Sequence, residues 1–591
     1  MRVAVIGGGP SGLVTLKTLI TANDSLPGTE PIEAMLFEAE DSIGGTFKYR
    51  AYEDAELVSS RQLTTFSDYR FTREGPDFLS TTEYCTYLEG YVQHFQLQDY
   101  IQLSSVVTKV SPNIDGGHIV KYTKHDQTLE YHCEAVAICS GLHVTPNIPI
   151  IKGIYNVPKV MHSSEFKKRK QFGVNKHVMI VGTGETGMDI AYLAITSQTR
   201  TVTLCHRDGF LCAPKRAPEV SWLGMKPATT AQGNVPYDVG AASLFDTAYV
   251  HPLLRDSFLP WWYYDRFAKW TTWLVSGTKA GLDQWIGEIS PERFHASKIF
   301  FNKSSKAMPY ISVFFRKRFF FASWVNTLRS YIAQIPVIDT GDREIDLAPW
   351  PQSVSHDGVV KFIKTKRLEG HVVRARGIVK PDILIFATGY IQSFPFLDAT
   401  YPLPQDADIR GICKQGNEDV AFIGFVRPSF GAIPPLAELQ AQHWTLSLLS
   451  RLPATLTPQD HYKLHYPLGS RIKYGVDHES YAYQLACDMG SAPSFTEVIC
   501  MGWKVAVTWA LSAQVNTKFR LVGPYKWEGA KKVMETEIWD TVARRRGFFG
   551  HFTLSFLPIV LFGTLSAVLW VLEQIYKALK FLWKLLTTSS D

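Results

Sequence analysis

Residues 3–12 read Val3-Ala4-Val5-Ile6-Gly7-Gly8-Gly9-Pro10-Ser11-Gly12, an apolar run that leads directly into a G-x-G-x-x-G turn. In such a turn the first glycine permits a sharp bend, the second lets the backbone approach a pyrophosphate, and the third lets helix and strand pack closely. The helix that follows offers unpaired N–H groups to the phosphates. The segment therefore predicts a nucleotide-binding turn, with cofactor contacts from Gly7, Gly9, Pro10, Ser11 and Gly12.

A second segment of the same kind begins at residue 178. The apolar run Val178-Met179-Ile180-Val181 leads into Gly182-Thr183-Gly184-Glu185-Thr186-Gly187, and a helical stretch follows. Asp189 on that stretch suits either the partial positive charge of a helix start or a ligand. One such turn is a weak signal, but two predict that the chain holds two dinucleotides and passes electrons between them. The predicted contacts are Gly182, Gly184, Thr186, Gly187 and Asp189.

The residue after the next strand of each unit predicts which nucleotide is bound. Glu38 follows the apolar run 34–37, and its carboxylate can accept hydrogen bonds from both ribose hydroxyls. It would clash with a 2′-phosphate, so the first site favours FAD or NAD. In the second unit Arg207 follows the strand at 202–205, and a cation there suits the 2′-phosphate of NADPH. A solvated surface position is the alternative for either side chain.

The length and composition describe a globular protein of more than one domain. Of its 591 residues, 46% are hydrophobic and 20% are charged, which suits two or three domains and excludes a disordered chain. The net charge of +6 is modest and spread out, which argues against nucleic-acid binding and is compatible with an anionic membrane surface. The eight cysteines never form C-x-x-C, so we expect no metal site and no redox-active disulfide.

The C-terminal end of the chain is apolar. No charged residue occurs from Phe552 to Leu572, a run that would span about 31 Å as a helix. Arginines at 544–546 precede it, and an amphipathic tail with lysines at 577, 580 and 584 follows. The pattern predicts association with a membrane, either across the bilayer or in its surface. A buried helix of a soluble domain is the alternative.

Five further motifs occur along the chain. They are Gly44-Gly45-Thr46-Phe47, Ser59-Ser60-Arg61 with Phe66-Ser67-Asp68-Tyr69, Cys139-Ser140-Gly141 with Pro146-Asn147-Ile148-Pro149, Phe386-Ala387-Thr388-Gly389-Tyr390, and Glu438-Leu439-Gln440-Ala441. With the two glycine turns and the apolar C-terminus, and in the same order, they resemble the flavin-containing monooxygenases of the dimethylaniline N-oxide-forming type. The resemblance covers most of the chain, although residues from about 450 to 545 carry no usable motif.

This resemblance implies an α/β fold with two Rossmann-like dinucleotide-binding domains. The NADPH domain would be inserted in the FAD domain, and a C-terminal membrane-anchoring helix would follow. A strand expected at residues 382–386 would return the chain to the FAD domain, with linkers at 141–166 and between 325 and 385. The predicted domains are 1–160 and 336–450 for FAD, 161–335 for NADPH with an aromatic insert, 451–545 for a C-terminal extension, and 546–591 for the anchor and amphipathic tail.

The resemblance also implies the reaction. NADPH reduces FAD, the reduced flavin binds O₂ as a C4a-hydroperoxide, and one oxygen atom passes to a nitrogen or sulfur nucleophile of a small apolar substrate. The cofactor performs the difficult step, and the protein positions the reactants and keeps water away. Baeyer–Villiger oxygenation of a ketone, an uncoupled NADPH oxidase and a quinone reductase are the alternatives. The motifs imply further cofactor contacts from Thr46, Phe47, Val58, Ser59, Thr388, Gly389 and Gln440.

Three features depart from the family pattern. Val58 stands where the family has an asparagine near flavin and nicotinamide, and valine donates no hydrogen bond. Water or Ser59 would have to substitute, or the oxygenated intermediate would be short-lived. Arg61 stands where the family has lysine, and Ser59 and Arg61 are the candidate catalytic residues. The family's linker motif Phe-x-Gly-x-x-x-His survives only as His162-Ser163, where a structural histidine is the favoured interpretation.

Two expectations concern the surroundings of the enzyme. The aromatic segment at 260–273 is predicted to be either a substrate lid facing the membrane or a packed helix of the inserted domain. Because an apolar C-terminal anchor is common in the family, we expect a membrane-associated protein at the endoplasmic reticulum with its catalytic domains facing the cytosol. The identity of the substrate and the oligomeric state stay open.

Overall fold

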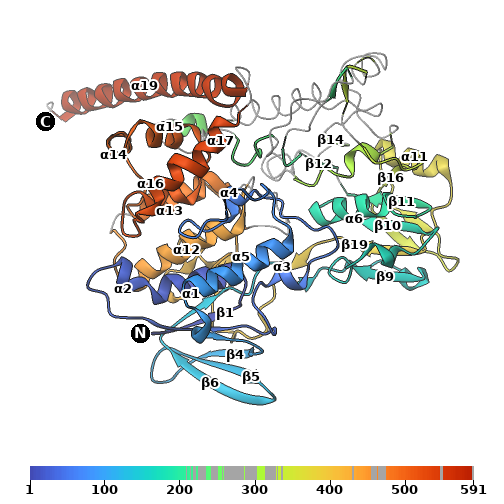
Figure 1. Cartoon of the computed structure of the whole chain (residues 1–591), viewed down its shortest axis with the longest axis horizontal. Coiled ribbons are helices and arrows are strands. Elements are labelled where there is room, and N and C mark those ends of the chain that lie inside the picture. The colour runs from blue at the N-terminus through green and yellow to red at the C-terminus, as the bar shows by residue number, and fades with distance from the viewer. Residues whose placement is uncertain are drawn as a thin grey trace.

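Two mainly parallel β-sheets organise the molecule (Figure 1). The computed structural model describes residues 1–72, 74–207, 209–212, 214–216, 221–223, 234–240, 251–255, 257, 285–286, 302–312, 328, 331–334, 337–428, 431–453, 462–463, 474–545 and 550–588. The aromatic segment predicted at 260–273 lies outside these described residues.

The first sheet is built around the strand that opens the chain. Its order is β21-β22-β7-β1-β2-β3, and β1 pairs in parallel with β2 and with β7. The central strands β1 and β7 are apolar and almost entirely buried, as strands covered on both faces must be. The bounds are Arg2–Ile6 for β1, Glu33–Phe37 for β2, Ile101–Gln102 for β3, Ala135–Ile138 for β7, Cys413–Lys414 for β21 and Asn417–Phe422 for β22.

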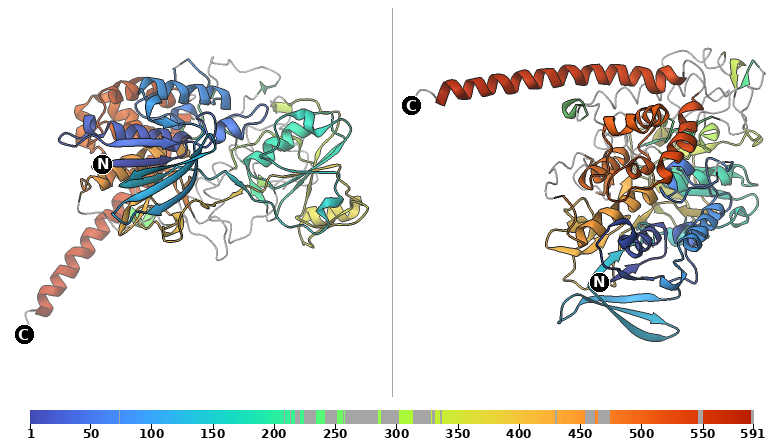
Figure 2. Two further views of the ribbon diagram at one scale, coloured as in Figure 1. Left: turned by 90° about the horizontal axis from the view of Figure 1, so that it is seen from below. Right: turned by 60° about the vertical axis from the view of Figure 1, so that its left-hand side comes forward.

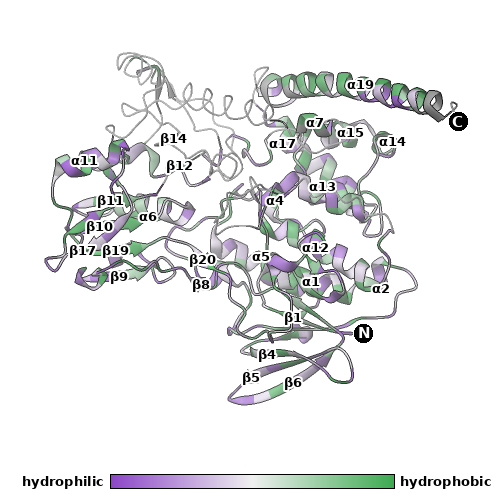
Figure 3. Cartoon of the chain, turned by 180° about the vertical axis from the view of Figure 1, so that it is seen from behind, coloured by the Kyte–Doolittle hydropathy of each residue, from purple (hydrophilic) through white to green (hydrophobic). Residues whose placement is uncertain are grey.

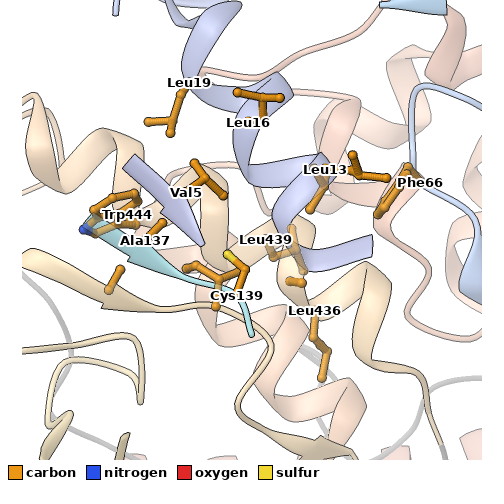
Figure 4. Packing of buried hydrophobic residues seen from close by; sticks show 14 of the residues in the cluster. Val5, Leu13, Leu16, Leu19, Phe66, Ala137, Cys139, Leu436, Leu439 and Trp444 are labelled. Atoms are coloured by element: carbon orange, nitrogen blue, oxygen red, sulfur yellow. The ribbon is translucent and has the colours of Figure 1, made fainter. Parts of the chain in front are cut away.

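Two helices from opposite ends of the sequence cover one face of this sheet. Helix α1 (Pro10–Ile20) follows the first glycine turn, defined here as residues 7–12, and packs beside α12 (Ile433–Leu448). Both helices send apolar side chains into one core against β1 and β7 (Figure 4). The core side chains drawn there include Val5, Leu13, Leu16, Leu19, Phe66, Ala137, Cys139, Leu436, Leu439 and Trp444.

The second sheet has the order β16-β11-β10-β19-β9, with every neighbouring pair parallel. Helix α6 (Glu185–Ile195) begins in the second glycine turn, defined here as residues 182–187, and packs against β10 and β11. The strands are β9 (Lys159–His162), β10 (His177–Val181), β11 (Thr201–Cys205), β16 (Ile345–Ala348) and β19 (Ile383–Phe386).

The strand predicted at 382–386 lies in this second sheet, so the prediction that it returns the chain to the first sheet was wrong. It pairs with β10, for example Val178 with Ile383, and with β9. The reason is that a short apolar strand is equally suited to the centre of either parallel sheet. Only with β21 and β22 does the chain rejoin the first sheet. The other predicted domain boundaries stay predictions.

The two segments that cross between the sheets lie side by side. Strand β8 (Thr145–Pro146), on the outward path, pairs antiparallel with β20 (Tyr390–Ile391), on the return path. The backbone N–H of Asn147 donates to the carbonyl of Gly389 at 2.9 Å. A two-stranded connection holds the sheets together more firmly than a single linker would, because backbone hydrogen bonds join the two crossings.

Smaller elements complete the two sheet regions. An antiparallel sheet of β4 (Val106–Pro112), β5 (His118–Lys124) and β6 (Gln127–Cys133) lies between β3 and β7 in the sequence. Beside the second sheet, β17 (Pro351–Val354) pairs with β18 (Val360–Phe362). The helices of these regions are α2 (Ala22–Ser25), α3 (Thr46–Tyr49), α4 (Arg61–Thr64), α5 (Thr81–His94) and α11 (Leu368–Arg376), whereas the short helix α7 (Pro252–Arg255) contacts the C-terminal helix.

The C-terminal extension is helical and packs on the first sheet region. It contains α13 (His478–Asp488), α14 (Phe495–Cys500), α15 (Trp503–Leu511), α16 (Gly529–Val533) and α17 (Trp539–Ala543). Buried ion pairs join it to the N-terminal part of the chain. Arg544 contacts both carboxylate oxygens of Asp77, at 2.9 and 2.7 Å, and the guanidinium of Arg70 contacts Glu537 at 2.9 Å.

Helix α19 (Leu557–Thr588) ends the described chain and projects away from the body (Figure 2). By length and composition its segment Ile559–Trp583 could cross a membrane, with a mean hydropathy of 1.7 and 11% of it buried. Green, hydrophobic residues run along it in Figure 3. Near its start it contacts α7, where the backbone N–H of His251 donates to the Ser566 hydroxyl at 3.0 Å.

Candidate active site

The first glycine turn lies at the carboxyl end of β1, where parallel strands bind ligands. Gly7 has a φ of 112°, and a side chain there would lie 2.6 Å from the carbonyl oxygen of Cys139. A side chain at Gly12 would lie 1.8 Å from the Gly7 carbonyl. Gly9 differs, because the nearest atom to a side chain there is Cα of Gly45, at 3.9 Å. The turn is therefore closed toward the sheet and open at Gly9, just before Pro10 begins α1.

Glu38 lies directly beside this turn. Its buried carboxylate accepts hydrogen bonds from the backbone N–H groups of Gly8, at 2.5 Å, and Glu40, at 2.9 Å. Burial raises the pKa of Glu38, although the two backbone N–H groups oppose the shift. The carboxylate is thus held at the end of β2, on the strand next to the glycine turn.

The Gly44-Gly45 turn and helix α3 form a second wall of the same site. Both glycines have positive φ, 114° and 52°, and the N–H of Gly44 donates to the carbonyl of Gly8 at 3.0 Å. Thr46 begins α3. The Phe47 ring contacts that of Tyr84 with a centroid separation of 4.7 Å. Thr46 and Phe47 are therefore next to the first glycine turn, where a bound dinucleotide would lie.

Gln440 supports the first glycine turn and is itself fully buried in α12. Its amide oxygen accepts from the N–H of Gly424 at 2.8 Å, and its amide nitrogen donates to the Tyr481 hydroxyl at 2.9 Å. Gly424 lies against Ser11, since a side chain there would lie 2.3 Å from the serine hydroxyl. The described contacts of Gln440 are with the protein scaffold that holds Ser11.

The second glycine turn repeats this geometry at the end of β10. Gly182 has a φ of 116°, and a side chain there would lie 2.3 Å from the carbonyl of Ala387. A side chain at Gly187 would lie 2.1 Å from the Gly182 carbonyl. At Gly184 no atom lies within 4 Å of the space that a side chain would take. The open position precedes α6, whose first turn contains Thr186.

Asp189 connects the second glycine turn to the first sheet region. Its carboxylate accepts from the Tyr52 hydroxyl at 2.6 Å and from the Ser304 hydroxyl. These contacts show that Asp189 holds neighbouring segments to α6. Tyr52 was not foreseen, because it is a single aromatic residue in a segment without periodicity.

Arg207 lies just past the end of β11 with its side chain exposed. Its guanidinium sits over the Trp350 ring, 5.0 Å from the centroid. The preceding residue, His206, is buried, and its Nε2 lies 3.2 Å from the Glu369 carboxylate. Although burial would raise it, the neighbouring His206 and the guanidinium of Arg367 lower the pKa of Glu369 to about 2. A cation beside an aromatic face can bind the phosphate of an adenosine nucleotide.

The segment at 58–61 leads into helix α4 and is largely buried. Val58 is half-buried, and the buried hydroxyl of Ser59 accepts from the Thr64 hydroxyl at 2.8 Å. Arg61 is buried, its guanidinium donates to the backbone carbonyl of Thr72, and burial lowers its pKa. The backbone N–H of Ser60 donates to the carboxylate of Asp238 at 2.6 Å. Asp238 is a buried partner of this segment that the sequence did not indicate.

Thr388 and Gly389 lie at the return crossing and contact the outward one. The Thr388 hydroxyl donates to the carbonyl of Asn147. The ring of His162 lies with Nε2 3.1 Å from the Gly389 carbonyl. Burial lowers the pKa of His162, which keeps the ring uncharged near neutral pH. These contacts agree with a structural role for His162 in the paired linkers.

Comparison with known proteins defines the family. A family model described as flavin-binding monooxygenase-like matches residues 1–216 and 361–546. The chain is 48% identical to the monooxygenase ptmN of Penicillium ochrochloron, over 97% of this chain and 95% of that protein. The chain belongs to the flavin-binding monooxygenase-like family. It is also 50% identical to the monooxygenase PC-14 of Penicillium crustosum, over 92% of this chain and 94% of that one.

A solved structure of this fold is the S-allyl-L-cysteine S-oxygenase of Allium sativum. The TM-score is 0.51 at 16% identity, over 92% of this chain and 98% of that chain. As a member of the flavin-binding monooxygenase-like family, this chain is an FAD- and NADP-dependent monooxygenase. The two glycine turns fit these groups, because each leaves open the single position, Gly9 or Gly184, where a side chain would occupy the pyrophosphate site.

Proposed function

We propose that this monooxygenase uses FAD, NADPH and O₂ to insert one oxygen atom at a nitrogen or sulfur atom of a small apolar substrate. The observation that carries the proposal is the position of Arg61. Baeyer–Villiger enzymes with this two-nucleotide plan usually carry an active-site arginine, and Arg61 is the arginine that the motif at 59–61 offers for that role. Its buried guanidinium instead donates to the Thr72 backbone carbonyl, which supports a heteroatom acceptor.

The protein contributes binding and orientation, and the described residues divide between the two nucleotides. At the first site, Glu38 would accept hydrogen bonds from ribose hydroxyls, and the N–H groups at the start of α1 would bind the pyrophosphate. At the second site, the start of α6 would bind the pyrophosphate and Arg207 the 2′-phosphate. When bound, the flavin takes up hydride and activates O₂.

A soft nucleophile needs little acid–base help at the atom that is oxygenated. An amine or sulfide offers a lone pair directly, so positioning and exclusion of water are the main demands on the protein. The Allium sativum protein with this fold is an S-oxygenase, which makes sulfides a natural acceptor to test beside amines. Thr388 and Gly389 lie in the paired linkers and would fix the position of one nucleotide site relative to the other.

A second function, an uncoupled NADPH oxidase, is favoured by one residue. Val58 offers no hydrogen-bonding side chain where the flavin-containing monooxygenases have an asparagine near flavin and nicotinamide. If nothing replaces the missing donor, reduced enzyme would pass its electrons to O₂ and release hydrogen peroxide without an oxygenated product. The ratio of product to NADPH consumed distinguishes this function from the proposed one.

Association with a membrane through α19 is part of the proposal. Its apolar residues stay largely exposed along Ile559–Trp583, which a membrane would cover. Removal of residues 551–591 should release the protein into the soluble fraction, while retention in washed membranes would contradict the anchor. The endoplasmic reticulum and the cytosolic orientation of the catalytic domains stay predictions.

A turnover screen tests the proposed reaction. Amines, sulfides and ketones are compared side by side for substrate-stimulated NADPH consumption, and products are analysed by mass spectrometry for the gain of one oxygen atom. N-oxides or S-oxides from ¹⁸O₂ would support the proposal. Lactones or esters from ketones would show Baeyer–Villiger chemistry instead, and peroxide without product would show an uncoupled oxidase.

A further inference from the structure

One side of helix α19 packs against α7. Phe562 is buried in one cluster with Leu254. The buried hydroxyl of Ser566 accepts from the backbone N–H of His251 at 3.0 Å, and the Glu573 carboxylate lies 3.1 Å from Nε2 of the same histidine. Positions 562, 566 and 573 recur at spacings of four and seven residues, which brings them onto one side of a helix. This side, defined by Phe562, Ser566 and Glu573, is the inner side of α19.

His251 gives the contact a defined geometry. Its Nδ1 accepts from the backbone N–H of Leu253 at 3.1 Å, so in the neutral ring the proton is on Nε2, which donates to Glu573. The ring also contacts that of Trp570, with 4.7 Å between the centroids. The imidazole itself is buried. Directed hydrogen bonds therefore hold α19 to α7 in addition to apolar packing.

The opposite side of α19 is apolar and exposed. At 3.6 residues per turn, five aliphatic side chains lie about half a turn away from the inner side, and each is 45% to 58% exposed. They define the outer side and are Val560, Val568, Val571, Ile575 and Leu582. No charged residue lies on this side along the described residues 557–588. A continuous row of exposed aliphatic side chains is typical of a surface that another apolar phase covers.

The charged residues of the helix continue the inner side beyond α7. Their spacings of four, three and four are the repeat of a single helical side, and they are Glu573, Lys577, Lys580 and Lys584. Nζ of Lys577 lies 2.7 Å from the Glu573 carboxylate. A helix with lysines on one side and aliphatic residues on the other is typical of the membrane interface, whereas a spanning helix is surrounded by hydrocarbon.

The contact with α7 occupies much of the segment that could cross a membrane. It extends from residue 559 to residue 573, which are the first 15 of the 25 residues in Ile559–Trp583. This is about 22 Å of helix, compared with about 30 Å for the hydrocarbon core. A crossing orientation would carry α7 and the polar pair of His251 and Glu573 into the hydrocarbon, which is unfavourable. In Figures 1 and 2 the described body lies on one side of α19.

We infer that α19 lies in the surface of one leaflet of an anionic membrane, with its outer side among the acyl chains. The inference rests on the membrane association proposed above. Between residues 574 and 583 the charged residues are Lys577 and Lys580. Anionic headgroups attract these cations, whereas a second copy of the helix would offer no acidic partner in this stretch. The catalytic body and the end of α19 are therefore on the same side of the membrane.

Protease digestion of sealed vesicles distinguishes this orientation from a crossing one. The full-length holoenzyme carries one peptide tag before Met1 and another after Asp591, and intact microsomes that contain it are digested from outside. We expect the protease to remove both tags without detergent. Loss of the first tag, with the second protected until detergent is added, would show that α19 crosses. That result would overturn the inference and leave the membrane association intact.

An exchange of two side chains tests the outer side at constant composition. Ile575→Lys combined with Lys577→Ile moves one cation to the outer side and leaves the mean hydropathy of the segment unchanged. We expect this holoenzyme to bind about tenfold more weakly to phosphatidylcholine vesicles that contain phosphatidylserine. The control, Gln574→Lys with Lys577→Gln, also separates Lys577 from Glu573 but keeps the cation off the outer side, and should stay within about twofold of wild type. Equal binding of both variants and wild type would overturn the inference.

Lipid composition separates the remaining outcomes. Wild type should bind vesicles with phosphatidylserine about tenfold more tightly than vesicles of phosphatidylcholine alone, and equal affinity would overturn the anionic preference. Failure of wild type to bind either kind of vesicle would refute the proposed membrane association together with this inference. A dimer in analytical ultracentrifugation that replaces vesicle binding, and that the exchange at 575 and 577 dissociates, would overturn the inference by assigning the outer side to a second copy.

Discussion

The hydroxyl of Tyr52 donates a hydrogen bond of 2.6 Å to the carboxylate of Asp189, across 137 residues of sequence. Tyr52 lies three residues after the end of α3, the helix beside the first nucleotide site. Asp189 lies on α6, just after the second glycine turn. Burial and the carboxylate together raise the pKa of Tyr52 well above its ordinary value, so the phenol stays protonated and donates. This bond couples the positions of the two nucleotide sites.

Replacing Tyr52 with Phe should impair the use of NADPH more than the retention of FAD. A hydrogen bond to a charged group contributes about 1.5–3 kcal/mol, so we expect the KM for NADPH to rise about tenfold or more. Tyr49→Phe is the matched control, because its hydroxyl also donates to a carboxylate, that of Asp41 at 2.5 Å, away from α6. Steady-state kinetics with flavin quantitation measure both effects. Equal effects in the two variants would contradict the coupling.

Arg207 should determine the preference for NADPH over NADH. Loss of its contact with a 2′-phosphate in Arg207→Ala removes about 2 kcal/mol, or about thirtyfold in the KM for NADPH. NADH lacks that phosphate, so its KM should stay within about twofold. Arg200→Ala, at the opposite end of β11, should leave both values near wild type. Equal losses with NADPH and NADH would show that Arg207 does not bind the phosphate.

The Glu369–His206 pair should make the second sheet region sensitive to acid. The folded-state pKa of Glu369 is about 2, below its ordinary value of 4.5. A lowered carboxyl pKa contributes stability that is present above pH 4.5 and is lost as the pH falls toward 2, up to about 3 kcal/mol. Glu369→Gln should therefore lower the Tm at pH 6 and flatten its decline on acidification. Glu130→Gln, which removes an exposed pair with Lys121, should change neither.

Local patterns were enough to predict much of the fold. The strands and helices around both glycine turns follow from apolar runs and glycine spacing, since these constraints act over a few residues. Strand β19 could not be assigned to its sheet, because its pairing with β10 depends on partners about 200 residues away. The helices of the C-terminal extension are joined to the N-terminal part of the chain by buried ion pairs such as Arg544 with Asp77. No sequence pattern indicates which residues form these pairs.

Only the backbone of the candidate site, which is formed by the two glycine turns, could be predicted from the sequence. Glycines at fixed spacing carry their own signature, whereas Asp238 is a single polar residue in a segment without periodicity. Asp238 reaches Ser60 across 178 residues, and Arg207 gains its contact with Trp350 only when β11 and β16 lie next to each other. A lone charged residue in a sequence is usually a solvated one, so its function becomes visible only when burial and partners are known.

The two open glycines allow each nucleotide site to be removed without unfolding the protein. Gly9 and Gly184 have extended backbones, with φ of −78° and −71°, which any residue can adopt. A Cβ atom at either position has no neighbouring atom closer than 3.9 Å. By contrast, Gly7 and Gly182 have positive φ and face backbone atoms, so substitution there should disrupt folding.

Gly9→Val should consequently yield a folded, colourless protein that no longer retains FAD, because the valine fills the place of the pyrophosphate. Gly184→Val should stay yellow but lose NADP⁺ binding and reduction by NADPH, while dithionite still reduces its flavin. Circular dichroism, flavin absorbance and calorimetric titration with NADP⁺ separate the two outcomes. A Gly9→Val protein that keeps its flavin, or a Gly184→Val protein that loses it, would reverse the assignment of the two sites. Loss of both ligands in either variant would show that the sites do not bind independently.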